Sequence, residues 1–387
     1  MGATKDELGR RILEAAERER DYMVSLLKEL VLLESPSDDA ESQKRVQGVL
    51  DRVLTELGFR VRVIPGEKGG GVLFALPRDR VRGRPAQLLL GHSDTVWPVG
   101  TLETMPLEEE EGRLRGPGVF DMKGGLVQMV VALRILRSLE MEPPATPLIL
   151  VNSDEEIGSP ESKPVIERMA RRVVRALVPE PSMGPDGKVK TARKGWSRFT
   201  LQVRGKAAHA GLDPEGGASA ILELAHMISV LHAMTDLKRG ITVNVGVISG
   251  GTRSNVIAAE ARGEVDVRVL RSADAEEVEK KILDLETTVP GTSLEVVPRG
   301  VVPPLEPTPG NRALWEAARE AARELGLELE ETTAGGGSDG NTTSRYTPTL
   351  DGIGAVGDGA HAPHEFLVLD RHVERCALLA RLLLLEP

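Results

Sequence analysis

Hydrophobic residues recur at helical spacing over the first sixty residues. Between residues 5 and 33, Leu8 and Ile12 begin an apolar stripe that Met23 resumes, and residues 41–57 carry a second stripe. Apolar side chains three or four positions apart lie on one face of a helix. We therefore expect two amphipathic helices to open the fold.

Apolar runs of strand length then alternate with helical segments as far as residue 193. The expected strands cover residues 60–64, 71–76, 86–90, 147–151 and 173–178, and the expected helices cover residues 124–139 and 161–172. Helices expected at residues 311–325 and 371–385 return the chain to the same layers. Strands that alternate with helices form a largely parallel sheet covered on both faces. This pattern therefore predicts an α/β fold with a mostly parallel sheet flanked by helices.

The order of the elements changes between residues 194 and 300. Strands are expected at residues 196–204, 242–249, 260–270 and 293–297, and helices at residues 218–233 and 273–285. This β-α-β-β-α-β order is typical of a two-layer α+β sandwich. Five prolines between Pro298 and Pro309 indicate an irregular crossing back to the first sheet. We therefore expect one domain made of residues 1–193 and 301–387, and an inserted domain made of residues 194–300.

Acidic and imidazole side chains gather near the ends of the expected strands. His92 and Asp94 follow one strand, Asp154–Glu156 leave another, and Glu180 follows a third, while Asp121 precedes a glycine pair that opens a helix. In open α/β sheets, ligand sites lie outside the carboxyl ends of the strands. Three adjacent carboxylates repel one another unless cations lie beside them. The sequence therefore predicts a metal site at this edge of the sheet.

The composition limits the choice of metal. The chain has one cysteine, Cys376, so neither an internal disulfide nor a cysteine-rich zinc module can form. Histidine and carboxylate ligands suit Zn²⁺, and also Mn²⁺ or Co²⁺. The candidate ligands outnumber the four positions of one tetrahedral ion, and we therefore expect two ions.

Charge and hydropathy argue against two classes of partner. The 49 basic and 59 acidic side chains give a net charge of −10, and aromatic residues make up 3%, a combination unsuited to nucleic acid. Residues 1–22 lack the apolar stretch of a secretory signal, and the longest apolar runs are far shorter than the ~18 residues that span a bilayer. We expect a cytoplasmic protein that acts on a small molecule or short peptide, without membrane or nucleic-acid partners.

The order of several motifs along the chain matches that of a known family. The motifs are His92-Ser-Asp94-Thr-Val, Gly116-Pro-Gly118, Asp121-Met-Lys-Gly-Gly125, Asp154-Glu155-Glu156, Glu180-Pro181, Gly205-Lys-Ala-Ala-His209-Ala-Gly211, Gly335-Gly-Gly-Ser-Asp339 and His361. Over nearly its whole length the chain resembles the M20 family of co-catalytic metallopeptidases, close to its glutamate carboxypeptidase (carboxypeptidase G-like) branch. The resemblance implies a fold of the di-zinc exopeptidase type, in which the inserted domain serves as a lid and as the dimerisation domain.

The resemblance also implies the metal ligands. Asp121 would bridge two Zn²⁺ ions in each subunit, His92 and Glu180 would complete one site, and Glu156 and His361 would complete the other. Two further acids have implied roles in catalysis. Glu155 would be the general base that takes a proton from water and passes it to the leaving amine. Asp94 would hydrogen-bond His92 and so fix the tautomer of that ligand.

A second set of residues is implied to bind the substrate. His209 matches a histidine that stabilises the oxyanion, often from the partner subunit, which implies a homodimer. Asn255 and Arg268 match residues that hold a substrate carboxylate, for which the forked guanidinium is suited. Gly336, in the glycine-rich motif, lets the backbone approach the substrate. Arg299 is a further candidate for binding a carboxylate on the substrate side chain.

The chain departs from the family pattern at two positions. Many relatives have an acid after the bridging aspartate, often with a cis peptide there, whereas this chain has Met122. The last motif contains two histidines, His361 and His364, where relatives more often have Asn or Asp at the fourth position. We favour His361 as the ligand because its spacing to Glu365 matches the family motif.

These features favour a zinc-dependent hydrolase that cleaves an amide beside a free carboxylate and releases a carboxyl-terminal, glutamate-type amino acid. The first alternative is an N-acyl-amino-acid deacylase, such as an acetylornithine or succinyl-diaminopimelate hydrolase, which uses the same metal chemistry. The second alternative is a homologue without catalytic activity that keeps the fold for binding. The presence of all five ligands and of Glu155 argues against this second alternative.

Overall fold

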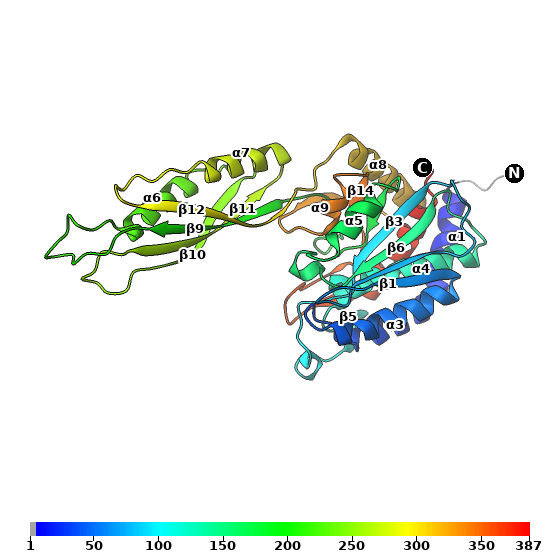
Figure 1. Cartoon of the computed structure of the whole chain (residues 1–387). Helices are drawn as coiled ribbons and strands as arrows, with labels where there is room; N and C mark the ends of the chain where they lie inside the picture. Colours follow the sequence, from blue (N-terminus) through cyan, green and yellow to red (C-terminus); the bar gives the residue numbers. More distant parts are fainter. Residues whose placement is uncertain (1–4) are drawn as a thin grey trace. The chain divides into compact units, whose positions relative to one another are not determined.

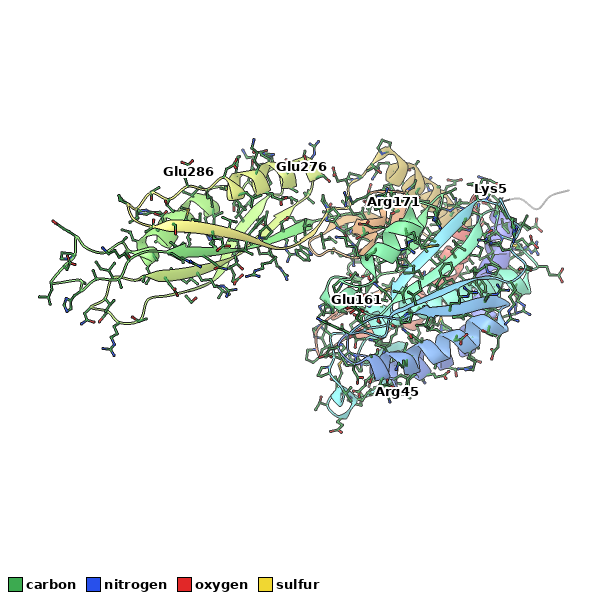
Figure 2. The ribbon with its side chains drawn as sticks, in the orientation of Figure 1. Lys5, Arg45, Glu161, Arg171, Glu276 and Glu286 are labelled. Carbon is green, nitrogen blue, oxygen red and sulfur yellow. The ribbon has the colours of Figure 1, made fainter. Side chains whose placement is uncertain are left out.

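The structure is a computed structural model that describes residues 5–387 (Figure 1). The chain forms two compact units. The first comprises residues 5–191 together with Pro307–Ala334 and Ser338–Pro387, and the second comprises Ala192–Glu306 with Gly335–Gly337. Charged side chains such as Arg45 and Arg171 in the first unit and Glu276 in the second are exposed (Figure 2).

An eight-stranded sheet forms the centre of the first unit. Its order is β1-β2-β6-β3-β7-β14-β8-β13. The strands are β1 (Phe59–Ile64), β2 (Val72–Pro77), β3 (Ala86–His92), β6 (Thr146–Asn152), β7 (Ala176–Val178), β8 (Val189–Arg193), β13 (Glu331–Ala334) and β14 (Thr349–Asp351). The four central strands β6, β3, β7 and β14 pair in parallel, and antiparallel pairs flank them. The predicted α/β class with a mostly parallel sheet is confirmed.

Helices cover both faces of this sheet. They are α1 (Lys5–Arg18), α2 (Arg20–Val31), α3 (Ala40–Glu56), α4 (Gly124–Ser138), α5 (Lys163–Ala170), α8 (Pro309–Glu324), α9 (Asp339–Thr343) and α10 (Leu369–Leu383). Along β3, Leu89 packs into a large core with α1–α4, α8 and α10, whereas Leu88 and Leu90 pack on the opposite face with Ile166 of α5. Within residues 5–387, no helix is both long and apolar enough to cross a membrane.

The amino-terminal helical segment differs from the expectation of two helices before the first strand. Three helices occur there, because the segment expected to be one helix is interrupted at Glu19. Glu19 has φ −87° and ψ 0°, and its carboxylate accepts a hydrogen bond of 2.7 Å from Nε of Arg134. This polar contact with α4 falls between the apolar stretches of α1 and α2. Periodicity alone could not locate the break, since both halves carry apolar residues at helical spacing.

A small antiparallel sheet lies beside the main one in the first unit. It contains β4 (Glu108–Glu110), β5 (Arg113–Arg115), β15 (Gly357–Asp358) and β16 (Phe366–Val368), in the order β15-β16-β5-β4. The pairing of β16 with β5 ties the segment around His361 to the segment that leads to Asp121. These strands have two or three residues each, too few for an alternating pattern to reveal them in the sequence.

The second unit is a two-layer α+β sandwich. Its antiparallel sheet has the order β10-β11-β9-β12, with β9 (Gly195–Arg204), β10 (Thr242–Gly250), β11 (Glu260–Val269) and β12 (Ser293–Val302). Helices α6 (Ala220–His232) and α7 (Ser272–Leu283) pack on one face, where Phe199, Leu201, Val265 and Val267 join the core. The other face presents alternate polar side chains of β9 and β11. The observed β-α-β-β-α-β order matches the expected one.

Strand β12 is longer than expected. The sequence suggested a short strand ending at Val297, followed by an irregular crossing, but β12 continues through Pro298 to Val302. Pro298 is tolerated because β12 is an edge strand and its register shifts between Pro298 and Gly300. At an edge or a bulge, the missing N–H of proline costs no ladder hydrogen bond.

Candidate metal centre

The carboxyl ends of the parallel strands β3, β6 and β7 deliver most of the predicted ligands. His92 is the last residue of β3 and is in register with Asn152, the last residue of β6. The short helix η3 (Glu155–Ile157) follows β6, and Glu180 lies two residues after β7. Strands that run in parallel end at the same edge of a sheet, which brings these residues together.

Asp121 reaches the same place from η2 (Val119–Lys123), immediately before α4. A glycine allows this approach, because a Cβ added to Gly125 would lie 2.1 Å from the main-chain oxygen of Pro179. Any larger residue would push the start of α4 away from the segment that carries Glu180. The peptide bond between Asp121 and Met122 is cis. Met122 is fully buried, and its sulfur lies 3.3 Å from the main-chain nitrogen of His92.

Five predicted ligands form two groups that share Asp121. Nε2 of His92 lies 3.4 Å from Oδ1 of Asp121 and 3.3 Å from Oε1 of Glu180. Nε2 of His361 lies 3.4 Å from Oδ2 of Asp121 and 3.1 Å from Oε2 of Glu156. In each group, the ligand atoms lie within 4.8 Å of one another. Asp121 thus presents one oxygen to each group.

The donor set fits divalent metal ions. Nε2 of His92 and Oε1 of Glu156 are buried without a hydrogen-bond partner, and such orphaned atoms are costly unless something binds them. Nitrogen and carboxylate donors without thiolate are the set found in catalytic zinc sites. His92, Asp121 and Glu180 would hold one ion, and Asp121, Glu156 and His361 would hold another.

The excess of carboxylates perturbs the pKa values of the cluster. Burial alone would raise the pKa of Asp121, but the adjacent imidazoles of His361 and His92 hold it well below its usual value. Burial raises the pKa of Glu156 to about 7. Hydrogen bonds to Asp121 and Glu156 raise the pKa of His361 to about 10.

Asp94 organises the site through both its main chain and its side chain. Nδ1 of His92 lies 2.9 Å from the main-chain oxygen of Asp94 and 3.4 Å from Oδ1 of its carboxylate. The carboxylate accepts hydrogen bonds from the N–H groups of Glu155 (3.3 Å) and Glu156 (3.0 Å) and from the hydroxyl of Ser37 (2.7 Å). A proton on Nδ1 leaves the lone pair of Nε2 for the metal ion that His92 would hold together with Asp121 and Glu180. The carbonyl therefore makes the shorter contact with His92, and the carboxylate holds the turn that carries Glu155.

Glu155 is partly buried beside the ligand cluster. Burial raises its pKa well above the usual value, and the charges of Glu180, Asp339 and Glu156 add to this effect while His92 opposes it. Behind the turn, Asp339 accepts hydrogen bonds from Asn152 (2.7 Å) and Ser159 (2.6 Å). The last residue of the glycine-rich motif therefore anchors the end of β6.

Glu365 is a site residue that the sequence analysis used only as a spacing marker. Its carboxylate is 1% exposed and accepts four hydrogen bonds: from the N–H groups of Gly118 (2.9 Å), Phe120 (2.9 Å) and Asp121 (3.0 Å), and from Nε1 of Trp97 (2.8 Å). Glu365, four residues after His361, therefore fixes the loop that carries Asp121. The signal that the sequence offered was an acid at a fixed spacing in the motif that carries His361.

His361 joins the ligand cluster through its ring, with its backbone in the left-handed region at φ 61°. His364, the alternative candidate, is exposed and lines a neighbouring cavity. His361 is the histidine that contacts Asp121 and Glu156. This is the histidine that the spacing to Glu365 favoured.

The remaining predicted residues belong to the second unit. His209 and Asn255 lie in loops joined by a hydrogen bond of 3.0 Å from the N–H of Ala210 to the main-chain oxygen of Asn255. His209 is exposed, and its Nδ1 accepts hydrogen bonds of 3.2 Å from the N–H groups of Gly211 and Leu212. Neutral His209 therefore carries its proton on Nε2, which is then the donor.

Arg268 and Arg299 lie on the polar face of the same sheet. Nε of Arg268 donates to Oδ1 of Asp266 at 2.7 Å, and Nε of Arg299 donates to Oγ1 of Thr200 at 2.8 Å. Gly336 belongs to the second unit, and its main-chain oxygen accepts from Nη1 of Arg193 at 3.3 Å. Arg268 is in register with Trp196 at the start of β9, whereas His209 follows the end of β9. The two lie at opposite ends of this sheet.

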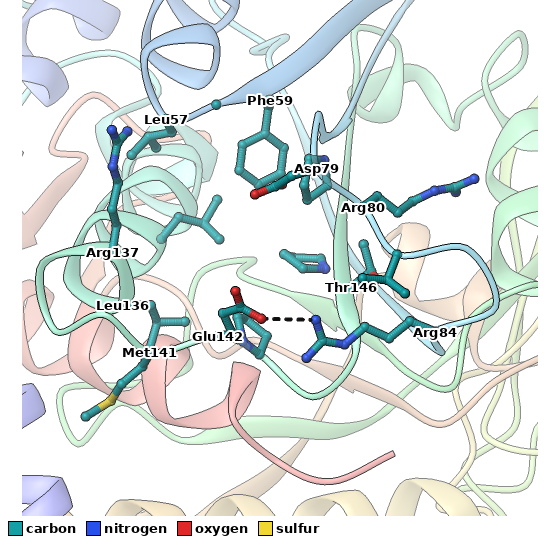
Figure 3. Close-up of a pocket in the computed structure, with 16 residues that line it drawn as sticks. Leu57, Phe59, Asp79, Arg80, Arg84, Leu136, Arg137, Met141, Glu142 and Thr146 are labelled. Atoms are coloured by element: carbon teal, nitrogen blue, oxygen red, sulfur yellow. Dashed lines mark hydrogen bonds and ion pairs between the residues drawn. The ribbon is translucent and has the colours of Figure 1, made fainter.

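A separate cavity of about 430 Å³ lies at the other end of the main sheet (Figure 3). Leu57, Phe59 and Leu136 contribute apolar walls, and Arg84 pairs with Glu142 at 3.4 Å. Thr146, the first residue of β6, also lines it, six positions before the end of that strand. In the described part of the chain, none of its lining residues is a predicted site residue.

Comparison with known proteins defines the family. Residues 88–385 match the sequence profile of Peptidase family M20/M25/M40, a span well over half of the chain. The chain belongs to this family. Together with the two ligand groups described above, membership establishes an M20 metal-dependent hydrolase. The resemblance drawn from the motifs is confirmed.

Several M20 relatives are similar over much of the chain. Carboxypeptidase G2 from Pseudomonas sp. (strain RS-16) is 28% identical over 381 residues, which cover 96% of this chain and 91% of that protein. Acetylornithine deacetylase from Myxococcus xanthus is 34% identical over 219 residues, which cover 53% of this chain and 55% of that protein. The structure of aminopeptidase PepT from Bacillus cereus ATCC 10987 has a TM-score of 0.76 at 22% identity, covering 94% of this chain and 98% of that one, and shares the fold.

Proposed function

We propose that this M20 hydrolase is a co-catalytic zinc carboxypeptidase that releases an acidic, glutamate-type residue from the carboxyl end of its substrate. The observation that carries this proposal is the similarity to carboxypeptidase G2 over 96% of the chain. The ligand geometry supports it further, since two groups of donors share Asp121. An arrangement of this kind is expected where two ions act on one substrate.

Different residues of the chain would carry out different steps of the reaction. Two bound divalent ions would lower the pKa of a water molecule and polarise the scissile carbonyl. Glu155 would accept the proton of that water and pass it to the leaving amine. Its raised pKa suits this exchange, because a more basic carboxylate takes up the proton of the water more readily. Asp94 would hold Glu155 in place through the main-chain N–H groups of the turn.

The second unit would supply the groups that bind the substrate. Arg268 keeps guanidinium N–H groups beyond those bound to Asp266, and these could bind a carboxylate. Nε2–H of His209 would donate to the oxyanion, with Asn255 beside it. Arg268 lies eight positions along β11 from Glu260, which is at the His209 end of the strand. At ~3.4 Å per residue, the distance between these two positions is about 27 Å. One copy of this sheet cannot bring both groups to one small substrate, which favours His209 acting at the site of a partner copy.

A homodimer is the second part of the proposal. The edge strand β10 exposes Val247 and Ile248, each 62% exposed, and α6 packs against this strand with Ile221 and Leu222 about half exposed. An open strand edge beside apolar side chains favours pairing with another chain. Light scattering should give twice the chain mass of 41.7 kDa, and Ile248→Glu should shift the protein to monomer with loss of turnover. A monomeric wild-type protein with full activity would contradict the dimer.

The rival function is an N-acyl-amino-acid deacylase. The 34% identity with acetylornithine deacetylase favours it, although that similarity covers 53% of this chain. The metal centre would serve both reactions, so a panel of substrates is needed to distinguish the carboxypeptidase from the deacylase. We expect faster hydrolysis of N-acylglutamates, including folate-type substrates, than of N-acetylornithine by the zinc-loaded enzyme. The reverse order would overturn the carboxypeptidase proposal and support the deacylase.

Metal analysis tests the ion content. We expect two Zn²⁺ per chain by elemental analysis after reconstitution. Asp121→Asn should lower the content toward zero because this residue contributes to both groups, whereas Glu180→Gln should affect one ion. One ion per chain in the active wild-type enzyme would refute the co-catalytic arrangement.

A further inference from the structure

The short segment between α2 and α3 runs beside the residues that follow β3. Pro36 pairs with Thr95 in a parallel bridge, and the N–H of Thr95 donates to the main-chain oxygen of Ser35 at 2.9 Å. Ser35 is fully buried, and its hydroxyl donates to the main-chain oxygen of Ser93 at 2.8 Å. Residues 33–37 are therefore tied directly to the stretch of chain that carries the first ligand.

The same segment contacts the chain that carries Asp121. Lys123 lies two residues after Asp121 in η2 and is buried. Its Nζ donates to the main-chain oxygen of Leu33 at 2.8 Å. One segment, outside all the sequence motifs, thus touches the stretches that supply His92 and Asp121.

Ser37 makes a third contact, with Asp94. The serine is buried, and its hydroxyl donates to Oδ2 of Asp94 at 2.7 Å. The same oxygen accepts the N–H of Glu156 at 3.0 Å, and Oδ1 accepts the N–H of Glu155 at 3.3 Å. Hydrogen bonds to an ionised carboxylate are stronger than those between neutral groups. Ser37 therefore restricts Asp94 to the orientation in which its carboxylate holds the turn of Glu155 and Glu156.

Gln43 of α3 supports this segment from its other side. Nε2 of Gln43 donates to the main-chain oxygens of Ser35 at 2.8 Å and Pro36 at 3.1 Å. Its Oε1 accepts the hydroxyl of Ser93 at 2.8 Å, and the side chain is fully buried. A buried network whose polar groups are paired is rigid. The segment is therefore fixed both to α3 and to the residues after β3.

We propose that Ser37 is a positioning residue of the metal centre that acts through Asp94, with residues 33–37 as its rigid support. This inference rests on the proposed metal ligands and on Glu155 as the base, and it is independent of which amide the enzyme prefers. Loss of the hydroxyl frees Asp94 to turn away from the N–H groups of Glu155 and Glu156. Both metal binding and turnover then weaken, although Ser37 touches neither metal nor substrate.

Zinc affinity gives a readout that does not depend on turnover. Competition with a chromophoric chelator would compare the full-length wild type with Ser37→Ala, well below the melting transition. The variant should bind zinc about 10-fold more weakly, the lower end of the range for outer partners of metal ligands. With both ions bound, its kcat should fall by about 10-fold while KM stays within about twofold, because the groups that bind substrate are unchanged.

Ser42→Ala is the matched control. Ser42 is also buried, and its hydroxyl also donates to a carboxylate at 2.7 Å, but the acceptor is Asp39, the N-cap of α3. This variant should bind zinc and turn over substrate like the wild type. In an Asp94→Ala background, Ser37→Ala should cause no further loss, because the hydroxyl acts through that carboxylate.

A second pair of variants tests the support of the segment. Gln43→Leu removes the hydrogen bonds to residues 35 and 36 and should weaken zinc binding by about 10- to 100-fold. Gln47→Leu is its control, since Gln47 lies one turn later in α3, is also buried, and donates to the main-chain oxygen of Gly70 at 2.9 Å. Gln47→Leu should retain wild-type zinc affinity.

The outcomes separate this role from the proposals on which it rests. Wild-type zinc affinity and kcat in Ser37→Ala would overturn the positioning role, and so would an equal loss in Ser42→Ala or a further loss in the Asp94→Ala background. A wild type that binds no zinc would overturn the ligand set and the positioning role together. Preferred turnover of N-acetylornithine over N-acylglutamate would overturn the carboxypeptidase proposal alone.

Discussion

Replacing Glu365 tests whether a buried carboxylate that binds no metal itself controls the metal centre. Glu365→Gln keeps the shape of the side chain. Its NH₂ group replaces one carboxylate oxygen and so faces two of the four N–H donors that now hydrogen-bond to the carboxylate. At about 1 kcal/mol for each hydrogen bond, two lost bonds should destabilise the protein by about 2 kcal/mol. Glu365→Ala loses all four and should cost about 4 kcal/mol by the same rule.

The effect on metal binding follows from where these bonds lie. Three of the four donors belong to the segment from Gly118 to Asp121, so Asp121, which belongs to both ligand groups, loses its support. Outer partners of metal ligands typically contribute 10- to 100-fold in affinity, and we expect about this loss for Glu365→Gln. Competition with a chromophoric chelator would measure the affinity, at temperatures well below the melting transition.

Glu223→Gln is the control for a general loss of stability. Glu223 is fully buried in the second unit and accepts hydrogen bonds from the N–H groups of Thr288 (2.9 Å) and Val289 (2.6 Å). Its replacement should lower stability without changing zinc affinity. If Glu365→Gln lost stability but retained wild-type zinc affinity and kcat, Glu365 would be a structural residue only and the reasoning would fail.

Three further predictions concern catalysis, packing and pH. Glu155→Gln should lower kcat by about 10²- to 10⁴-fold, with unchanged zinc content by elemental analysis; wild-type turnover would exclude Glu155 as the base. Gly125→Ala should lower the free energy of unfolding by about 1–3 kcal/mol, because the added Cβ would lie 2.1 Å from a carbonyl oxygen. Chemical denaturation measures this loss. Gly48→Ala is the control and should not destabilise the protein, because Gly48 lies in open space within α3. In the metal-free protein, the pKa of Glu156 is raised to about 7 and that of His361 to about 10. A pKa that is higher in the folded protein than in the unfolded chain stabilises the fold while the group is protonated, and this stability is lost as the group ionises. The melting temperature of the metal-free protein should therefore fall as the pH rises from about 5 to about 10. A melting temperature that does not change with pH in the presence of chelator would contradict these shifts.

Local patterns in the sequence account for much of the fold. The apolar runs of β3 and α4 are visible without tertiary information, because both elements are buried nearly all round and their sequences are therefore almost continuously apolar, while the length of each run separates strand from helix. The break at Glu19 and the continuation of β12 through Pro298 leave no such record. The break coincides with a contact between Glu19 and Arg134, and the strand depends on its position at a sheet edge.

The sequence by itself determined which chemical groups are available near the metal centre. His92, Asp121 and Glu180 stand in motifs whose order along the chain points to one family. Only the tertiary structure decided how these groups meet, since Asp121 and His361, 240 positions apart, come from outside the main sheet and meet beside His92 at the end of the parallel strand β3. It also decided the role of Glu365, because a hydrogen-bond partner is a property of neighbours in space and not of neighbours in the chain.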